Sequence, residues 1–354
     1  MQDFIKINKD DNVAVALKPI AKGTTVNVAG TEVTTVEDIP QGHKFVIKEI
    51  KNGDPVIKYG FRIGFAQADI PVGAWVHTHN LKTGLGELLE YTYEPEGHKD
   101  VEPTEPAYFD GYMRENGKVG VRNEVWIVPT VGCVNSIARA IEATARMNKP
   151  EGVDEVVAFT HPYGCSQTTE DQENTRKILA DLINDFKEYF IKNGQEIYEN
   201  PSPGNKDGGI TTLEDKSLGC TQKSGSSLVK GVLAYAEPVH TKGLNLLSAP
   251  GNDLVAATAC AASGAQMVLF TTGRGTPFAS PVPTVKIATN SRLAGNKSNW
   301  IDFNAGRIVT DDLPLEDAAK ELFQLVLDVA SGKKVKAEIA GFHDLAIFKQ
   351  GVTL

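Results

Sequence analysis

Two stretches that share one pattern decide the fold class: VWIVPTVGC at residues 125–133 and VVAFTHPYGC at residues 156–165. Each begins with a short apolar run, typical of a buried strand, and ends in a turn that carries a Gly-Cys pair. A helical pattern follows the first stretch, with Ile137, Ile141 and Ala145 on one face. Because strands that alternate with helices form parallel sheets, the sequence predicts an α/β fold.

The same alternation continues toward the C-terminus. Strands are predicted at residues 244–247, 267–270 and 285–289, a helix of small residues at 253–265, and an amphipathic helix at 315–329. The turns GCVN, HPYGC, PGND and TTGRG each begin where a predicted strand ends. Open α/β sheets bind ligands outside the carboxyl ends of their strands, so we expect these turns to meet at one edge.

The N-terminal part has a different pattern. Residues 1–92 contain short apolar runs separated by Gly, Pro and Asn turn signals, which indicates a small β-clip or barrel. Residues 93–108 are mostly acidic, include three prolines and lack apolar periodicity, as a stiff linker does. We therefore predict a multi-domain chain, with a β domain at 1–92, a linker at 93–108, and two Rossmann-like α/β domains with mostly parallel sheets at 109–199 and 200–354.

The composition of the 354 residues is that of a soluble globular protein, with 41% hydrophobic and 23% charged residues. A net charge of −9 argues against a nucleic-acid partner, because phosphate binding favours a basic surface. No run approaches the ~20 apolar residues of a membrane helix, and the start MQDFIKINKDDN lacks a signal peptide's features. Four scattered cysteines do not form a disulfide framework, so we expect a cytoplasmic protein.

The motif HTHN at 77–80 follows a predicted strand at 74–76. Alternation along a strand would place His77 and His79 on the same face, where both imidazoles reach one divalent ion. Two histidines are too few for a closed structural zinc site, so open positions would remain for substrate or water. The alternative is a pair of polar histidines at a strand end that bind nothing.

Cys133 and Cys165 each follow a glycine at a predicted strand end, with His161 close to the second. Thiolates there could bind iron, hold an iron–sulfur cluster or act as nucleophiles. The alternative is that each is a small buried residue where a helix begins. Cys220 and Cys260 have weaker settings, and Cys260 is interpreted as a helix-packing residue.

Basic residues in glycine-bearing segments are candidates for binding an acidic substrate. Arg114, Lys118 and Arg122 precede the first α/β strand, Arg274 lies in TTGRG, and Lys206 lies in a loop rich in Gly and Pro. Guanidinium groups bind carboxylates bidentately, although each residue could equally belong to a solvated turn. No phosphate-loop ending and no GxGxxG appears, so a nucleotide is not expected.

Taken together, these segments resemble the altronate/galactarate dehydratase family, and residues 1–92 resemble its SAF-type domain. The resemblance covers nearly the whole chain. The motifs that carry it are HTHN (77–80), GYMRENGKVGVRN (111–123), VPTVGCVN (128–135), THPYGCSQ (160–167), NPSPGNKDGG (200–209), EDKSLG (214–219), FTTGRGTPF (270–278) and PVPTVKIATN (281–290).

The resemblance implies a hydro-lyase that converts a sugar acid, most closely altronate, to a 2-keto-3-deoxy acid with iron(II) or manganese(II). Alternatives are a galactarate or hydroxy-acid lyase with an iron–sulfur cluster, or a non-catalytic sugar-acid-binding protein. A small-molecule substrate and a homo-oligomer are expected, with no membrane partner. For such a reaction we expect His77 and His79 to bind the metal or to transfer protons, with Cys133 and Cys165 as further candidate metal ligands. His161 and Lys118 are further catalytic candidates. The candidate substrate-binding residues are Arg114, Arg122, Asn123, Lys206 and Arg274.

One departure from the family lies after residue 182. Family members are well over a hundred residues longer and continue into a strand with a Gly-Cys-Glu motif. In this chain Leu182-Ile183 runs directly into residues 184–189, which resemble a helix that the family places much later. Two interpretations stay open: an internal deletion, which would remove a third cysteine, or a middle segment that is missing from this sequence.

Overall fold

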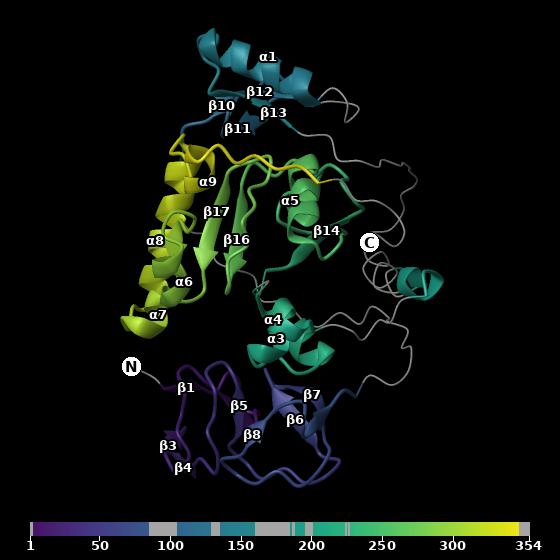
Figure 1. The fold of residues 1–354 in the computed structure, drawn as a ribbon, viewed down its shortest axis with the longest axis vertical. Helices are drawn as coiled ribbons and strands as arrows, with labels where there is room; N and C mark the ends of the chain where they lie inside the picture. The colour runs from purple at the N-terminus through teal and green to yellow at the C-terminus, as the bar shows by residue number, and fades with distance from the viewer. Residues whose placement is uncertain are drawn as a thin grey trace. The chain divides into compact units, whose positions relative to one another are not determined.

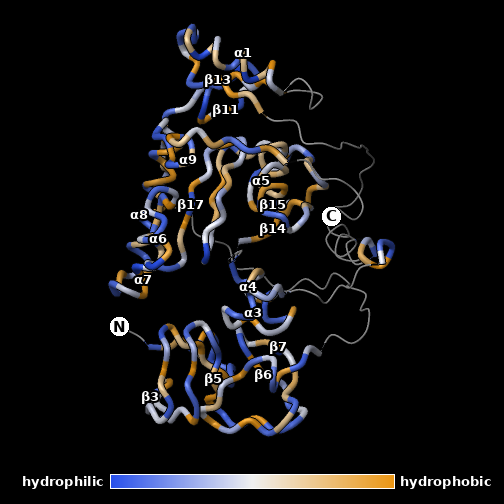
Figure 2. The backbone as a smooth tube through the Cα atoms, viewed as in Figure 1, coloured by the Kyte–Doolittle hydropathy of each residue, from blue (hydrophilic) through white to orange (hydrophobic). Residues whose placement is uncertain are grey.

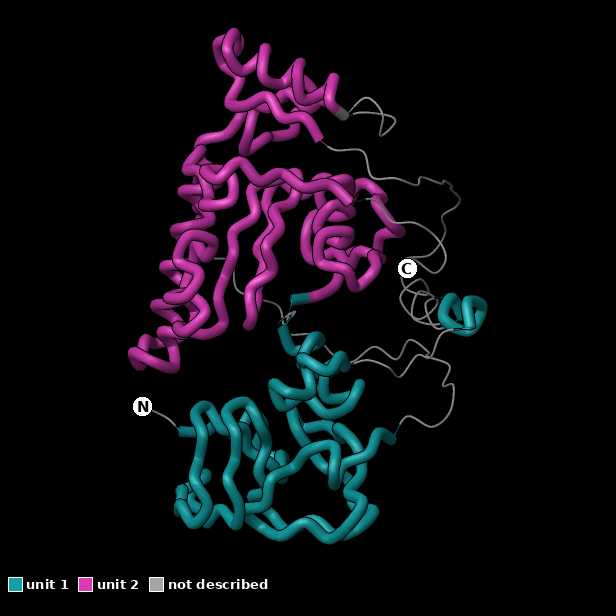
Figure 3. The backbone as a smooth tube through the Cα atoms, viewed as in Figure 1, with its two compact units in different colours: residues 1–94, 180–227 teal, residues 95–179, 228–354 magenta. Residues whose placement is uncertain are grey.

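The computed structural model describes residues 3–84, 105–128, 135–159, 185, 188–194, 201–223, 225 and 227–346. The chain divides into two compact units, residues 1–94 with 180–227 and residues 95–179 with 228–354 (Figure 3). This division differs from the predicted boundaries in two ways. Residues 180–227 join the N-terminal unit, and residues 95–179 and 228–354 form one compact unit where two α/β domains were predicted. Within the described ranges, no helix combines the length and the apolar character needed to cross a bilayer.

The first unit is built on an antiparallel β domain, which confirms the β-rich prediction for the N-terminal part. Its sheets have the orders β1-β2-β5-β8, β6-β7-β9 and β3-β4. In β3 the burial alternates, so Val26 and Val28 point into a core that also contains Phe45. The strands are β1 Phe4–Ile5, β2 Val13–Ala16, β3 Thr25–Val28, β4 Thr31–Thr34, β5 Lys44–Val46, β6 Pro55–Lys58, β7 Phe61–Ala66, β8 Trp75–Val76 and β9 Leu81–Lys82.

A distant segment packs on this β domain beside β7 (Figure 1). Leu218 packs against the core formed by β2, β5, β6 and β7. The Thr212 hydroxyl donates to the carbonyl of Ile63 at 2.5 Å, and the Glu214 carboxylate accepts from the Gly84 amide at 2.7 Å. The segment therefore belongs structurally to the N-terminal domain. Its helices are α3, Pro203–Asp207, and α4, Leu213–Lys223.

The second unit contains parallel strand pairs, in agreement with the predicted α/β class. Strands pair in parallel as β12-β13, β14-β15 and β16-β17-β18, while β10-β11 is an antiparallel hairpin. The elements are β10 Tyr112–Met113, β11 Val119–Gly120, β12 Glu124–Ile127, α1 Asn135–Met147, β13 Glu155–Ala158, β14 Val229–Leu233, β15 Leu244–Leu247, α5 Asp253–Ala262, β16 Val268–Thr272, β17 Thr284–Ala288, α6 Ser291–Asn296, β18 Phe303–Asn304, α7 Arg307–Thr310, α8 Leu315–Ala330 and α9 Lys336–Ile339.

The core of this unit lies between β17 and α8, which run alongside each other in Figure 1. Val285 and Ile287 are buried against Leu322, Leu325 and Val329 of the helix. Apolar residues at helical spacing predict this buried face of α8, and the structure confirms it. The small-residue helix α5 is also confirmed, and most of it has the hydrophobic colour in Figure 2.

Helix α1 differs from the prediction in the face that it buries. Its pattern predicts Ile137 and Ile141 in a core, but these side chains are 58% and 51% exposed. Ala138 is buried instead, where α1 packs on β13. A small residue thus makes the close helix–strand contact, and the larger apolar side chains remain at the surface.

Candidate functional site

The HTHN motif forms a turn closed by its own asparagine. Strand β8 ends at Val76, and the Asn80 side chain accepts from the His77 amide at 3.0 Å while donating to the Trp75 carbonyl at 2.9 Å. The expected strand alternation therefore does not extend through the two histidines. Both rings instead lie against Trp75: His77 is stacked at 5.3 Å and 11°, and His79 is tilted at 5.3 Å and 53°.

His43 completes this cluster, although no local motif in the sequence marks it. Lys44 pairs with Val76 across β5 and β8, so His43 lies opposite His77, with ring centroids 4.9 Å apart. Its Nδ1 accepts from the Trp75 indole N–H at 3.0 Å, and its Nε2 lies 3.1 Å from the carbonyl oxygen of Asp207. Because a carbonyl only accepts, Nε2 carries the proton. Burial of the ring lowers the pKa of His43.

His77 is held in its neutral form. Burial, followed by the nearby His43, Lys44 and His79, lowers the pKa of His77 to about 4. Its buried Nδ1 has no hydrogen-bond partner. A neutral imidazole with an unpartnered nitrogen has the donor chemistry of a metal ligand, whereas a group with so low a pKa accepts a proton weakly.

Of the predicted metal ligands, the structure describes only His77 and His79, two imidazoles of one turn that both lie against Trp75. Across the part of the chain that the structure describes, no cluster of three or more His, Cys, Asp or Glu side chains has metal-binding geometry. The other predicted ligands, Cys133 and Cys165, lie outside the described residues, as does His161.

Residues 203–209 contact this cluster, which brings a second family motif to the HTHN turn. The Asp207 carbonyl reaches His43, and the Gly209 carbonyl accepts from Lys44 Nζ at 2.7 Å. Lys206, predicted to bind a substrate carboxylate, is half-buried in the same segment. The imidazoles and this lysine therefore belong to one compact unit.

A buried ion triad fixes this arrangement. The Asp215 carboxylate binds Lys44 Nζ at 2.9 Å and Lys58 Nζ at 3.0 Å, and the Lys44 and Asp215 side chains are 0% exposed. Burial alone would raise the pKa of Asp215, but the two ammonium groups lower it. The pKa of Lys44 is lowered by burial despite its carboxylate partner. The triad joins β5 and β6 to α4.

In the second unit, Arg114, Lys118 and Arg122 line one pocket of about 290 Å³, together with Trp126. Arg114 donates to the Asn123 side-chain oxygen at 2.7 Å and to the Arg122 carbonyl at 2.9 Å. The Asn123 amide group donates to the Gly152 carbonyl at 2.6 Å. The three basic side chains therefore lie around one pocket, while the Asn123 side chain hydrogen-bonds to Arg114 and to the backbone.

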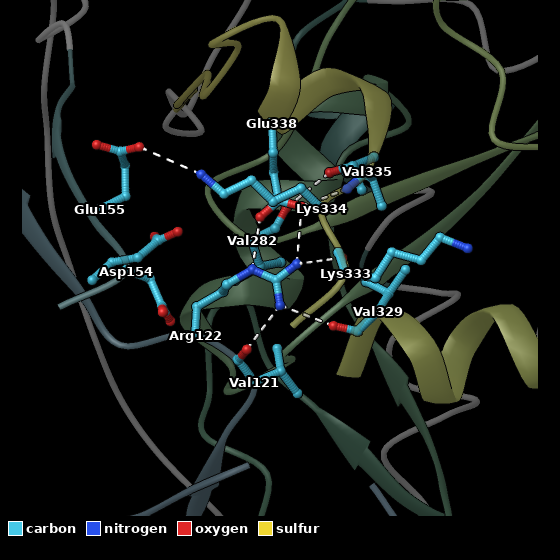
Figure 4. Close-up of polar contacts among 12 residues, drawn as sticks. Val121, Arg122, Asp154, Glu155, Val282, Val329, Lys333, Lys334, Val335 and Glu338 are labelled. Carbon is cyan, nitrogen blue, oxygen red and sulfur yellow. Dashed lines mark hydrogen bonds and ion pairs between the residues drawn. The ribbon is translucent and has the colours of Figure 1, made fainter. Parts of the chain in front are cut away.

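Arg122 was predicted to bind a substrate carboxylate, but its guanidinium group is occupied by other parts of the protein. Its five N–H donors are all occupied, by the Glu338 carboxylate twice and by the carbonyls of Val121, Val329 and Lys333 (Figure 4). A substrate carboxylate would have to displace the Glu338 pair, so Arg122 as placed is a structural residue.

Replacing Glu338 with alanine should lower the free energy of unfolding by about 3 kcal/mol, because it leaves a buried guanidinium without its anion. The two side chains are only 7% and 6% exposed. Urea unfolding monitored by circular dichroism measures the change. Asp317→Ala, which removes an exposed pair with Lys320, is the control and should stay within about 0.5 kcal/mol of the parent. Equal effects of the two substitutions would contradict the structural role.

Two of the predicted turns meet at the carboxyl ends of the strands in the second unit. In the turn after β16, the Gly273 carbonyl accepts from Asn290, which follows β17, at 2.9 Å. The Thr276 hydroxyl lies 3.3 Å from the Asp253 carboxylate, so TTGRG and PGND lie together. Arg274 is exposed in this turn. The turns with Cys133 and Cys165 fall outside the described residues.

Comparison with known families places the chain in a class of sugar-acid dehydratases. Residues 2–84 match the altronate/galactarate dehydratase SAF domain, and residues 130–353 match the C-terminal region of D-galactarate/altronate dehydratases. The chain belongs to the altronate/galactarate dehydratase family. Both the N-terminal SAF domain and the family expected from the motifs are thereby confirmed.

Three characterised relatives show how far the similarity extends. The altronate dehydratase of Bacillus subtilis is 38% identical over 499 aligned positions that cover all of both chains. The altronate dehydratase of Escherichia coli is 38% identical over 494 positions, covering 99% of this chain and all of that protein. The galactarate dehydratase (L-threo-forming) of E. coli is 34% identical over 223 positions, covering 62% of this chain and 42% of that protein.

The length of these alignments bears on the predicted deletion. The Bacillus alignment has 499 positions and this chain has 354 residues, so more than a hundred positions hold no residue of this chain. That difference agrees with a deletion relative to the family. Its location after residue 182 stays a prediction.

Proposed function

We propose that this chain dehydrates altronate to a 2-keto-3-deoxy sugar acid and water. The end-to-end similarity to two altronate dehydratases carries the proposal, because the galactarate dehydratase aligns with less than half of its own length. The substrate is a small acid, and the acidic, cysteine-poor chain fits a cytoplasmic enzyme, which we propose to be a homo-oligomer.

The reaction removes the C2 proton and the C3 hydroxyl group, and the resulting enol tautomerises to the 2-keto acid. The C2 proton is only weakly acidic, so the carbanion needs stabilisation. A bound iron(II) or manganese(II) ion would stabilise the ene-diolate and the departing hydroxide. The protein must also bind the carboxylate and hold a base at C2.

The first unit offers residues for these tasks. His77 is the proposed metal ligand, because it is neutral and its Nδ1 is unpartnered. His79, exposed on the same turn, would act as a second ligand or transfer a proton. Lys206 supplies a cation for the substrate carboxylate. In the second unit, the basic residues that we propose for carboxylate binding are Arg114, Lys118 and Arg274. Cys133 and Cys165 remain proposed metal ligands, and His161 remains a proposed base.

A keto-acid assay combined with calorimetry tests this function. The purified full chain, supplied with Fe(II) or Mn(II), should release keto acid from altronate faster than from galactarate. Heat of altronate binding without keto acid would instead support a sugar-acid-binding protein. A preference for galactarate would overturn the choice of substrate.

Removal of the metal should abolish turnover reversibly. Chelation with EDTA followed by dialysis is expected to lower the keto-acid rate at least tenfold, and re-addition of Mn(II) should restore it, because the weakly acidic C2 proton requires a Lewis acid. A visible absorbance band in anaerobically purified protein that disappears in air together with activity would favour the iron–sulfur alternative.

A further inference from the structure

His43 connects residues 203–209 to the imidazole pair. The residue is only 4% exposed, and both nitrogens of its ring are used. Nδ1 accepts from the Trp75 indole at 3.0 Å, and Nε2 donates to the Asp207 carbonyl at 3.1 Å. The same ring lies edge-on to His77, at 4.9 Å and 70°. One buried ring therefore contacts the segment, the indole and the proposed metal ligand.

The backbone on either side of His43 is held tightly against the same segment. Gly209 has φ +95°, and a Cβ there would lie 2.2 Å from the Gly42 carbonyl oxygen. Gly42 has φ +84°, and a Cβ there would lie 2.8 Å from the Gly208 oxygen. A side chain at either position would push the two backbones apart. Lys44 adds its bond to the Gly209 carbonyl at 2.7 Å.

The orientation of the His77 ring depends on these contacts. Its Nδ1 makes no hydrogen bond, so neighbouring rings rather than a polar partner hold that side of the imidazole. Trp75 stacks on it at 5.3 Å and 11°, and the Trp75 indole is itself held by His43. Displacing residues 203–209 would release His43, then Trp75, and thereby the His77 ring.

We propose that His43 is a positioning residue of the dehydratase site, which transmits the docking of residues 203–209 to the orientation of the His77 imidazole. The inference rests on the proposed function for its catalytic consequence. The structural coupling between Asp207, His43, Trp75 and His77 does not depend on that function, because it is argued from the contacts given above. Partners that orient a metal-binding histidine typically contribute 10–100-fold to activity or metal affinity.

Two matched pairs of variants test the proposal. His43→Gln keeps one acceptor and one N–H donor, whereas His43→Leu keeps neither. Gly209→Ala forces the backbones apart, whereas Gly208→Ala is the control, because its Cβ would lie 3.4 Å from the nearest atom. We expect His43→Leu and Gly209→Ala to lower kcat about 10–100-fold with KM changed less than about threefold. His43→Gln should recover most of kcat, and Gly208→Ala should match the parent.

A spectroscopic readout separates this proposal from the proposed function. In ¹H–¹⁵N spectra of the full chain, the Trp75 indole N–H and His77 ring resonances should move in His43→Leu and Gly209→Ala. In His43→Gln and Gly208→Ala they should stay near their positions in the parent. Unmoved resonances in His43→Leu, or equal impairment of His43→Gln and His43→Leu, would overturn the coupling. A parent chain without keto-acid turnover refutes the dehydratase function, while the resonances still decide the coupling.

Discussion

Replacing Asp215 with alanine is expected to lower the free energy of unfolding by about 3–5 kcal/mol, because two ammonium groups lose their shared carboxylate. Lys44 is fully buried and Lys58 is 9% exposed at its side chain, so water cannot replace the lost anion. Without that anion, the contact between α4 and the β domain should weaken. Thermal and urea unfolding of the full chain measure the change, with Trp75 fluorescence reporting on the first unit.

The matched control for Asp215 is Glu49→Ala, which removes an exposed carboxylate that also pairs with a lysine, Lys51. It should change stability by less than about 1 kcal/mol. A triple variant, Asp215→Leu with both lysines replaced by methionine, should recover most of the loss, since apolar residues of similar volume often replace buried ions without cost. An Asp215→Ala chain as stable as the Glu49→Ala chain would contradict the triad's structural role.

Replacing both His77 and His79 with alanine is expected to lower kcat/KM for altronate at least 10²-fold, while the melting curve stays close to that of the parent. Both imidazoles are proposed to act at the metal or on a proton, and such groups typically contribute 10²–10⁴-fold. His79 is exposed and the His77 Nδ1 has no partner, so little folding energy depends on either polar group.

Keto-acid release measures this effect, and equilibrium dialysis with Mn(II) measures the accompanying loss of metal affinity. His240→Ala, which removes an exposed histidine of the second unit, serves as the control and should retain full turnover. Undiminished turnover in the double variant would remove the SAF-domain imidazoles from the proposed mechanism.

The regular elements were largely predictable because their signals are local. Apolar runs mark β12, β15, β16 and β17, and helical periodicity marks α8. Periodicity failed for α1, whose large apolar side chains are exposed, because it identifies an apolar face without showing what covers that face.

Only those residues of the candidate site that lie in a local sequence motif were predictable. HTHN indicates His77 and His79, but His43 becomes visible only from the register that pairs Lys44 with Val76. Asp215 lies more than 150 positions from both of its lysines, so no local pattern joins them. Arg122 was predicted to bind substrate because the sequence shows its charge but not the five acceptors that occupy it.

Proton NMR of the reaction in deuterium oxide examines the chemistry of the proposed dehydratase most directly. If the chain eliminates water across C2 and C3 of altronate, the enol takes up a solvent deuteron at C3. We expect the parent chain to form a 2-keto-3-deoxy acid carrying one deuterium at that carbon, and the His77→Ala/His79→Ala variant to lose this product. Altronate recovered without this product, in the presence of Fe(II) or Mn(II), would contradict it.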